Sequence, residues 1–161
     1  MIKLILLLAV LAVLPTTLNA QDATTPDGVL IYKRCAACHL PTGAGIPGAY
    51  PKLGAQVAGF SASKAGRDYL ITVIAAGLMG ELKLDGSTYH GYMPAQNALS
   101  DDQIAAVLNY VVKKIAKAPA SVKEFSAAEA NAARSSHKDA HGQESMKLRP
   151  LETIGKHGTE K

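Results

Sequence analysis

Apolar residues recur three and four positions apart in several stretches of the chain, which is the spacing of an amphipathic helix. The clearest stretch begins at Ser100, whose hydroxyl and the side chain of Gln103 match a capping box. Its apolar face repeats until Pro119 ends the pattern, at Ile104, Val107, Leu108, Val111, Val112 and Ile115. No run alternates between apolar and polar residues as a half-buried strand does, so we expect an all-α domain.

Two further helices are predicted upstream of this one. Asp27 is a suitable N-cap for a first helix, which places one group of residues near a single face: Gly28, Ile31, Cys35 and Cys38. Ser63 opens the second helix, which ends near Gly77 and has its apolar stripe at Tyr69, Leu70, Val73 and Ile74. Segments 40–63 and 77–97 are predicted to be loops, and the first is so rich in Gly and Pro that regular structure is not expected there.

The first twenty residues have the pattern of a secretory signal peptide. Lys3 supplies a positive start, Leu4 to Leu14 form an apolar run, and Ala20 is small enough for cleavage after it. The run has eleven residues, whereas a membrane span needs about 20. We therefore predict that residues 1–20 are a signal peptide directing the chain to a bacterial periplasm, without stable membrane insertion after cleavage.

The chain beyond the third helix differs in composition, so residues 21–118 are assigned to one domain and residues 119–161 to a C-terminal extension. Ser126 and Glu129 form a second capping box, which predicts a short helix over residues 127–136. Residues 137–161 are expected to be a flexible or loosely docked tail. Its histidines are interpreted as surface residues because their spacing is too irregular for a metal site: His137, His141 and His157.

The charge balance restricts the possible partners only slightly. The whole chain has a net charge of +4, and the predicted mature chain, which lacks Lys3, has 16 basic and 13 acidic residues. There is neither a dense Lys/Arg stripe nor a set of stacking aromatics, since the chain has two Phe, six Tyr and no Trp. Nucleic-acid binding is therefore not expected.

The only two cysteines lie in the segment Cys35-Ala36-Ala37-Cys38-His39. Two thiols three positions apart on a helical turn can add to the two vinyl groups of a porphyrin, and the following histidine then faces the iron. A thioredoxin-like redox pair would need a strand–helix unit near the motif, and a zinc site would need a second ligand pair. We therefore predict one covalently bound haem c, attached through Cys35 and Cys38 and ligated by His39.

The order of these features resembles monohaem class I cytochrome c over about residues 28–117. The features are an exported Cys-x-x-Cys-His near the start, a Gly/Pro loop, a middle helix, a Met-Pro loop and a final amphipathic helix. The resemblance implies the cytochrome c fold, in which three main helices surround one haem and the first and last helices cross. It also implies one-electron transfer between redox proteins that act as donor and acceptor.

The sixth iron ligand has several candidates in this sequence. Met93 is preferred because Pro94 holds it in an extended conformation, and because Tyr89-His90-Gly91-Tyr92-Met93-Pro94 resembles the ligand loop of the family. A methionine sulfur favours ferrous iron relative to imidazole, which suits a carrier with a higher potential. The alternatives are ligation by His90, ligation by Met79, an open site, and Met93 as a simple apolar plug.

Further roles are suggested for a proline and several tyrosines. Pro51 lies where the family has the proline whose carbonyl accepts the ring N–H of the proximal histidine, although it is also interpretable as a simple loop proline. The family often has an aromatic residue four positions before the first Cys, whereas Ile31 lies there and Tyr32 follows, with Tyr110 as a possible partner. Three tyrosines are candidates for the haem edge or propionates, with packing at the rim as the alternative: Tyr50, Tyr89 and Tyr92.

Two functions are therefore compared. The first is a periplasmic electron carrier with His39 and Met93 as axial ligands and no substrate of its own, hence not an enzyme. The second is a peroxidase-like haem enzyme, which would need an open or displaceable sixth position and an acid/base group such as His90. The sequence favours the carrier because Met93 is available to fill the sixth position.

Overall fold

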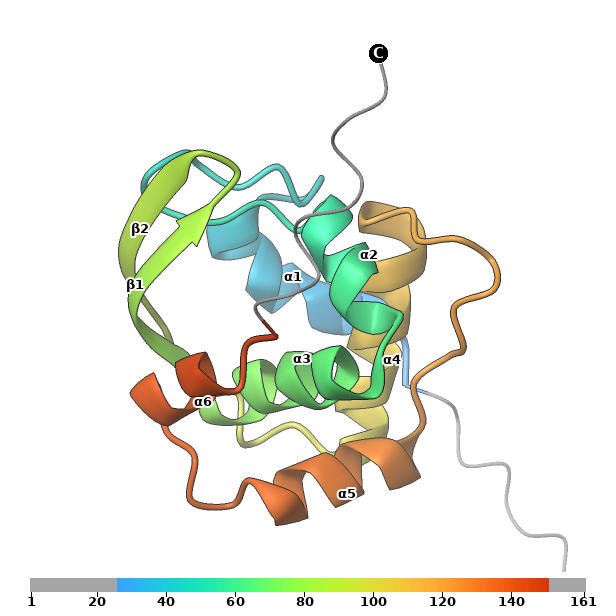
Figure 1. Cartoon of the computed structure of the whole chain (residues 1–161). Coiled ribbons are helices and arrows are strands. Elements are labelled where there is room, and N and C mark those ends of the chain that lie inside the picture. The colour runs from blue at the N-terminus through green and yellow to red at the C-terminus, as the bar shows by residue number, and fades with distance from the viewer. Residues whose placement is uncertain (1–25, 151–161) are drawn as a thin grey trace, which may run out of the picture.

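The computed structural model describes residues 26–150, and within them the chain is mostly helical, as predicted (Figure 1). The proposed signal peptide and His157 lie outside the described residues. In chain order the elements are α1 (Gly28–His39), α2 (Ala55–Ser61), α3 (Lys64–Ala76), β1 (Leu78–Leu84), β2 (Ser87–Met93), α4 (Asp101–Tyr110), the π-helical turn η1 (Val111–Ile115), α5 (Ala127–Ser136) and α6 (Gln143–Lys147).

The predicted helix starts are confirmed by their caps. Asp27 accepts a hydrogen bond from the backbone N–H of Val29 at 2.8 Å. Ser63 caps α3, and Ser100 and Gln103 form a complete capping box at the start of α4. The helix over residues 127–136 is present with Ser126 as its N-cap. Each cap satisfies backbone donors that the first helical turn leaves without a partner.

Two predicted loops contain regular structure that was not expected. Segment 40–63 includes helix α2, so the prediction that its Gly and Pro exclude regular structure was wrong for residues 55–61. Segment 77–97 includes an antiparallel hairpin of β1 and β2, joined by a turn at Asp85 and Gly86 with φ angles of 50° and 75°. Both φ angles are positive, as in the tight turns that match the twist of paired strands.

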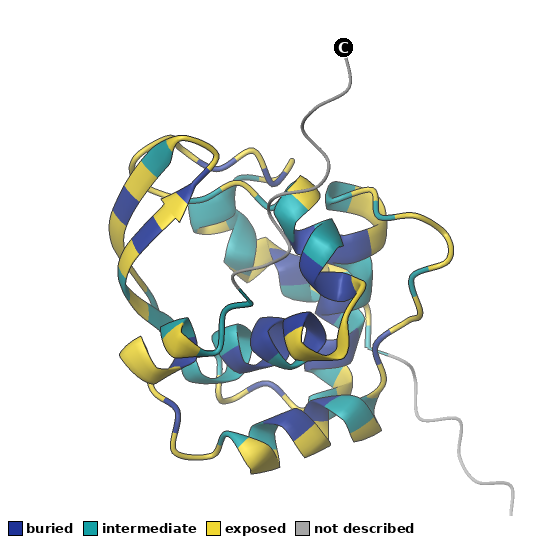
Figure 2. Ribbon diagram, viewed as in Figure 1, coloured by how far each residue is buried: buried dark blue, intermediate teal, exposed yellow. Residues whose placement is uncertain are grey.

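The core is centred on α4, which packs against α1, α3 and α5 (Figure 2). Ile104 and Ile71 are fully buried, and Val107 is 1% exposed. Tyr32 is 3% exposed and its ring centroid lies 5.3 Å from that of Tyr110, so the partner suggested for Tyr32 is correct. This contact joins the first and last helices of the domain.

The crossing of α1 and α4 depends on a glycine. A methyl group added at Gly28 would lie 2.3 Å from the carbonyl oxygen of Ala106 and 3.0 Å from Cβ of Tyr110. We expect Gly28→Ala to separate the helices and to lower the free energy of unfolding by about 1–3 kcal/mol, as overpacked cores do. Denaturant unfolding of the haem-loaded protein measures this loss. Leu30→Ala on the exposed side of α1 is the control, and equal stability of both variants would contradict the prediction.

The extension docks on the helical domain through a buried arginine. Arg67 of α3 is 8% exposed, and its guanidinium lies 3.8 Å from the ring centroid of Phe125. Its Nε and Nη2 donate to the two carboxylate oxygens of Glu129, at 2.5 Å and 2.6 Å. A second link joins Arg134 of α5 to Asp101 of α4 at 2.7 Å.

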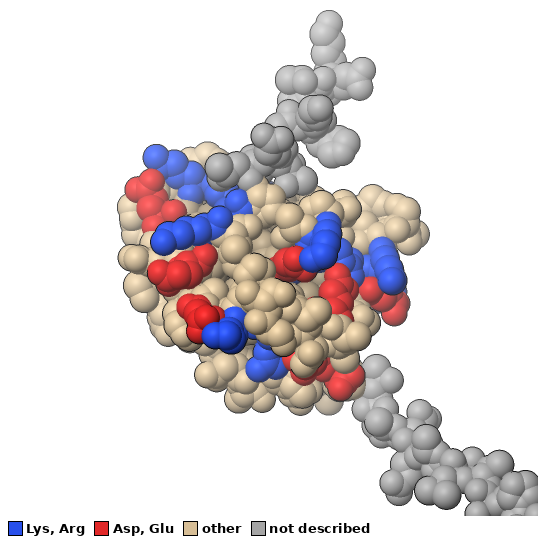
Figure 3. Space-filling model, turned by 60° about the horizontal axis from the view of Figure 1, so that its bottom comes forward, with Lys and Arg blue, Asp and Glu red and all other residues tan. Residues whose placement is uncertain are grey.

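On the face turned forward in Figure 3, acidic and basic side chains interleave rather than forming a field of one sign.

These links make docking of the extension sensitive to acid. The Arg67 guanidinium holds the pKa of Glu129 below its usual 4.5, and hydrogen bonds from Asn131 and then Arg134 hold the pKa of Asp101 below its usual 3.8. A carboxyl whose pKa falls on folding stabilises the fold above its usual pKa, and this stabilisation is lost as pH falls further.

We therefore expect α5 to lose amide-exchange protection as the pH falls from about 5 to about 3, by a modest amount because both carboxyl groups are partly exposed to water. Protection factors measured at several pH values test this expectation. Glu129→Gln is expected to flatten the dependence, whereas the control Glu144→Gln, on the exposed side of α6, is not. An unchanged slope in Glu129→Gln would contradict the assignment.

Candidate functional site

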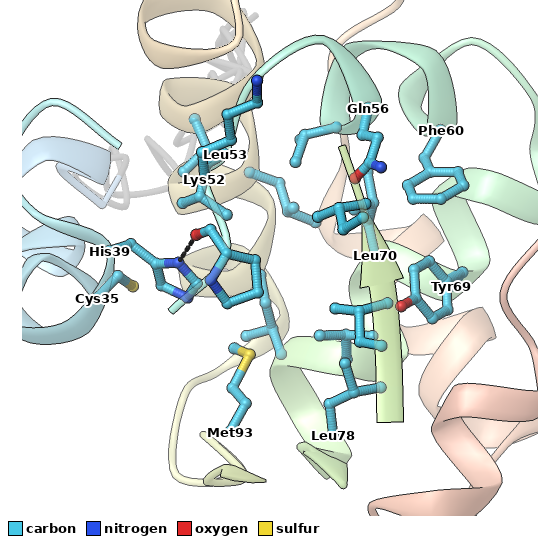
Figure 4. A pocket seen from close by; sticks show the side chains of 18 of the residues that line it. Cys35, His39, Lys52, Leu53, Gln56, Phe60, Tyr69, Leu70, Leu78 and Met93 are labelled. Atoms are coloured by element: carbon cyan, nitrogen blue, oxygen red, sulfur yellow. Dashed lines mark hydrogen bonds between the residues drawn. The ribbon is translucent and has the colours of Figure 1, made fainter. Parts of the chain in front are cut away.

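A cavity of about 810 Å³, including its open mouth, lies between α1, the segment before α2, α3, the hairpin and α4. Figure 4 shows Cys35 and His39 at one end and Gln56, Phe60 and Tyr69 at the other. The walls are mainly apolar, with contributions that include Leu53, Val57, Leu70, Val73, Ile74, Leu78, Leu82, Leu84, Val107, Leu108 and Val111.

His39 ends α1 and lines this cavity. Its Nδ1 lies 2.8 Å from the carbonyl oxygen of Pro51, as the resemblance implied (Figure 4). A carbonyl can only accept, so Nδ1 carries the proton and Nε2 keeps its lone pair. Burial lowers the pKa of His39, and the hydrogen bond to Pro51 opposes that shift. The ring is thus held as a neutral imidazole with one orientation, which is the form that ligates a metal.

Cys35 and Cys38 lie one helical turn apart on α1, and no disulfide joins them. Cys35 lines the large cavity. A second hollow adjoins this cavity, and Cys38, His39 and Met93 are among the residues that line it. Burial is the main cause that raises the pKa of the Cys35 thiol. Because His39 and Met93 line both hollows, the two thiols and the imidazole border adjoining spaces.

The hairpin separates the candidates for the sixth ligand. Side chains alternate between the two faces of a strand, so Tyr89, Gly91 and Met93 share one face of β2 while His90 lies on the other. Met93 is half-buried and lines both hollows, and its thioether points into the space beside His39 (Figure 4). By contrast, the His90 side chain is 70% exposed and Met79 is 45% exposed.

A close backbone approach fixes the strand that carries Met93. Gly77 has a φ of 77°, and a methyl group added there would lie 2.5 Å from the carbonyl oxygen of Met93. Leu78 is paired directly with Met93 in the sheet. The end of α3 is thus in contact with the Met93 backbone, which only a residue without Cβ permits.

The residues present fit a flat, largely apolar group that has polar atoms at one edge. The apolar walls supply the surroundings for its ring, and His39 supplies a lone pair. At the end remote from Cys35, Nε2 of Gln56 is buried without a hydrogen-bond partner in the described structure. A buried donor of this kind requires an acceptor, which the propionates of a haem would provide. The site therefore fits haem.

Comparisons with known proteins give the class of the molecule. The cytochrome c family model matches residues 26–114, more than half of the chain. Two cytochrome c-552 sequences, both from Thermus thermophilus, are each 47% identical over 85 residues, covering 53% of this chain and 65% and 57% of those proteins. The chain thus spans less than two thirds of the relatives it matches. It belongs to the cytochrome c family, and its Cys35–Cys38 pair implies covalent haem c.

Part of the cavity wall was not identified from the sequence. Gln56 and Phe60 belong to the unpredicted helix α2, and Leu82 and Leu84 belong to the unpredicted hairpin.

Of the remaining histidines, His137 is half-buried and His141 is exposed. Among residues 26–150, no helix is long and apolar enough to cross a membrane.

Proposed function

We propose that this cytochrome c is a one-electron carrier in which His39 and Met93 are the axial ligands of the haem iron. The observation that carries the proposal is that the free Nε2 of His39 and the sulfur of Met93 border the same apolar cavity. Bound haem supplies a one-electron iron couple without making or breaking bonds in a substrate. A family relationship to cytochrome c-552 supports a carrier rather than an enzyme.

The protein residues set the properties of that couple. The Pro51 carbonyl fixes the His39 ring and increases its basicity as a ligand. Met93 offers a neutral thioether, which favours the ferrous state relative to a second imidazole. The apolar walls exclude water and so disfavour the extra positive charge of the ferric state. The Met93 thioether and the apolar walls therefore both raise the reduction potential of the iron, which suits a carrier between a donor and an acceptor.

The proposed contact with redox partners is the mouth of the second hollow. Cys38, Ala49, Tyr50, Gly91 and Tyr92 line it. Tyr92 is 62% exposed and Tyr50 is 39% exposed. Exposed aromatic residues around a cofactor edge suit transient docking because they offer apolar contact without fixed charge. We propose that the donor and the acceptor protein both contact this surface.

The proposed compartment is the periplasm, which rests on the sequence pattern of residues 1–20. Expression of the full gene in a bacterium with haem-attachment machinery, followed by mass spectrometry of the product, tests it. A mature chain beginning at Gln21 with one haem added is expected. A chain that retains residues 1–20 would contradict the export proposal.

Spectra of the haem-loaded protein in both redox states test the carrier function. We expect a six-coordinate, low-spin haem in both states, with the weak near-red band of sulfur ligation in the ferric protein. Addition of peroxide and a reducing dye is expected to give little turnover, because the sixth position is filled and His90 faces away from the cavity. A high-spin ferric spectrum with rapid turnover would favour the peroxidase-like alternative.

A further inference from the structure

The C-terminal extension runs alongside β1, the strand that pairs with β2, which carries Met93. Contacts advance together along the two segments: Gly142 lies against Met79, Met146 packs against the cluster containing Leu82, and Nη2 of Arg149 donates to the Lys83 carbonyl at 3.3 Å. Figure 1 shows α6 beside the start of β1. In the described structure the sheet has two strands, so this segment covers the edge of β1 that β2 leaves unpaired.

The fit at the start of this segment is close. Gly142 is buried with a φ of 50°, and a methyl group added to it would lie 3.0 Å from Cβ of Met79. Its N–H donates to the carbonyl of Ala76, the last residue of α3, at 3.3 Å. Ser145 of α6 is fully buried. Gly142 is therefore packed on the point where α3 passes into β1, and the residues after it continue along β1.

That point lies beside the strand residues that are paired with Tyr92 and Met93. Met79, which Gly142 touches, is paired with Tyr92, and the preceding residue Leu78 is paired with Met93. A hairpin of two strands is only marginally stable by itself, so what packs against it decides how often it opens. If β1 moves from α3, its partner strand moves with it and Met93 leaves the cavity wall.

We infer that Gly142 and α6 are positioning elements for Met93, which keep the sixth ligand in place by holding β1 against the end of α3. This inference rests on the proposed ligation by Met93. It assigns a role to the end of the extension, beyond the region matched by the family model. Local opening of a segment costs less free energy than global unfolding, so α6 acts on the hairpin opening that releases Met93.

The experiment measures how readily added imidazole replaces Met93 in the ferric, haem-loaded protein. Imidazole can bind only when the thioether has left, so its apparent dissociation constant reports the opening of the hairpin. The near-red band provides the signal. Gly142→Val introduces a branched side chain at a positive φ against Met79, and Met146→Ala removes the packing on the Leu82 cluster.

Gly142→Val is expected to tighten apparent imidazole binding by about tenfold, and Met146→Ala by about threefold. Ile104→Val is the control for general destabilisation, since Ile104 is buried in α4 and does not line the cavity. Gln143→Ala, exposed on α6, is the control for a neutral change. Neither control is expected to tighten imidazole binding by more than about twofold. The midpoint potential should remain near that of the parent, because the ligands are unchanged when the hairpin is closed.

Imidazole affinities equal to the parent in both variants would overturn the inference, as would tightening no greater than that of Ile104→Val. If Gly142→Val does not fold, Met146→Ala decides by the same comparison. A parent protein without the near-red band would overturn the ligation by Met93 and this inference together. A parent with the band and variants without an effect would overturn only the role of α6.

Discussion

Replacement of both Cys35 and Cys38 by serine is expected to abolish covalent haem attachment and to prevent formation of the native fold. Serine hydroxyls do not add to vinyl groups under the conditions in which thiols do, so no thioether forms. The apolar cavity between α1, α3, α4 and the hairpin would then lose the group that it surrounds. The apolar side chains around it would face water, and a domain stabilised by about 5–15 kcal/mol cannot sustain that loss.

Haem staining of the denatured chain measures attachment, and far-ultraviolet circular dichroism measures folding. Ala37→Ser is the matched control, because it introduces the same hydroxyl at an exposed position between the two cysteines. It should retain both haem and helix content. Each single cysteine variant is expected to keep one thioether and to fold with reduced stability. A double variant with parental helix content would contradict the view that haem completes the core.

The helical frame was predictable because its signals are local. Ser63, Ser100 and Ser126 each cap a helix through contacts within a few residues, and such contacts are legible in a sequence. The attachment motif is equally local. The hydrogen bond between His39 and Pro51 spans twelve residues, yet its position followed from resemblance to the family rather than from local pattern.

The hairpin was missed although it has a local signal. Asp85-Gly86 is among the strongest two-residue turns, and Leu82 and Leu84 alternate with Glu81 and Lys83 before it. The alternation lasts only a few residues and is interrupted by glycines at positions 80 and 91. Helix α2 was missed for a different reason. It has no side-chain cap, and its stability comes from burying Val57 and Phe60 in the core.

The docking of the extension depends on contacts far apart in sequence. Arg67 and Glu129 are separated by 62 positions, and the Glu129 side chain, assigned from sequence to a capping box, instead binds Arg67. Arg149 reaches Lys83 across 66 positions. A charged residue near a helix start has several possible partners, and only tertiary packing chooses among them. The sequence therefore predicted the helix in the extension but not what the extension does.

Met93→Leu is expected to remove the near-red band of the ferric protein and to lower the midpoint potential by roughly 0.1 V or more, within the span of about 0.8 V that axial ligands control. Leucine has nearly the volume of methionine, so packing at the cavity wall changes little while the sulfur is lost. Without the thioether, the ferric iron binds water or another oxygen or nitrogen ligand at the sixth position. The ferric state then becomes more stable relative to the ferrous state.

Met79→Leu and His90→Ala are the matched controls, because both residues lie on the outer face of the same hairpin. Each removes an alternative ligand while leaving Met93 in place, and each should keep the band and the parental potential. Absorption spectra and redox titration in the presence of mediators measure both quantities. Retention of the band in Met93→Leu together with its loss in Met79→Leu would transfer the ligand role to Met79. That result would require the hairpin to turn over, because Met79 pairs with Tyr92 and Met93 pairs with Leu78, so the two methionines lie on opposite faces in this register.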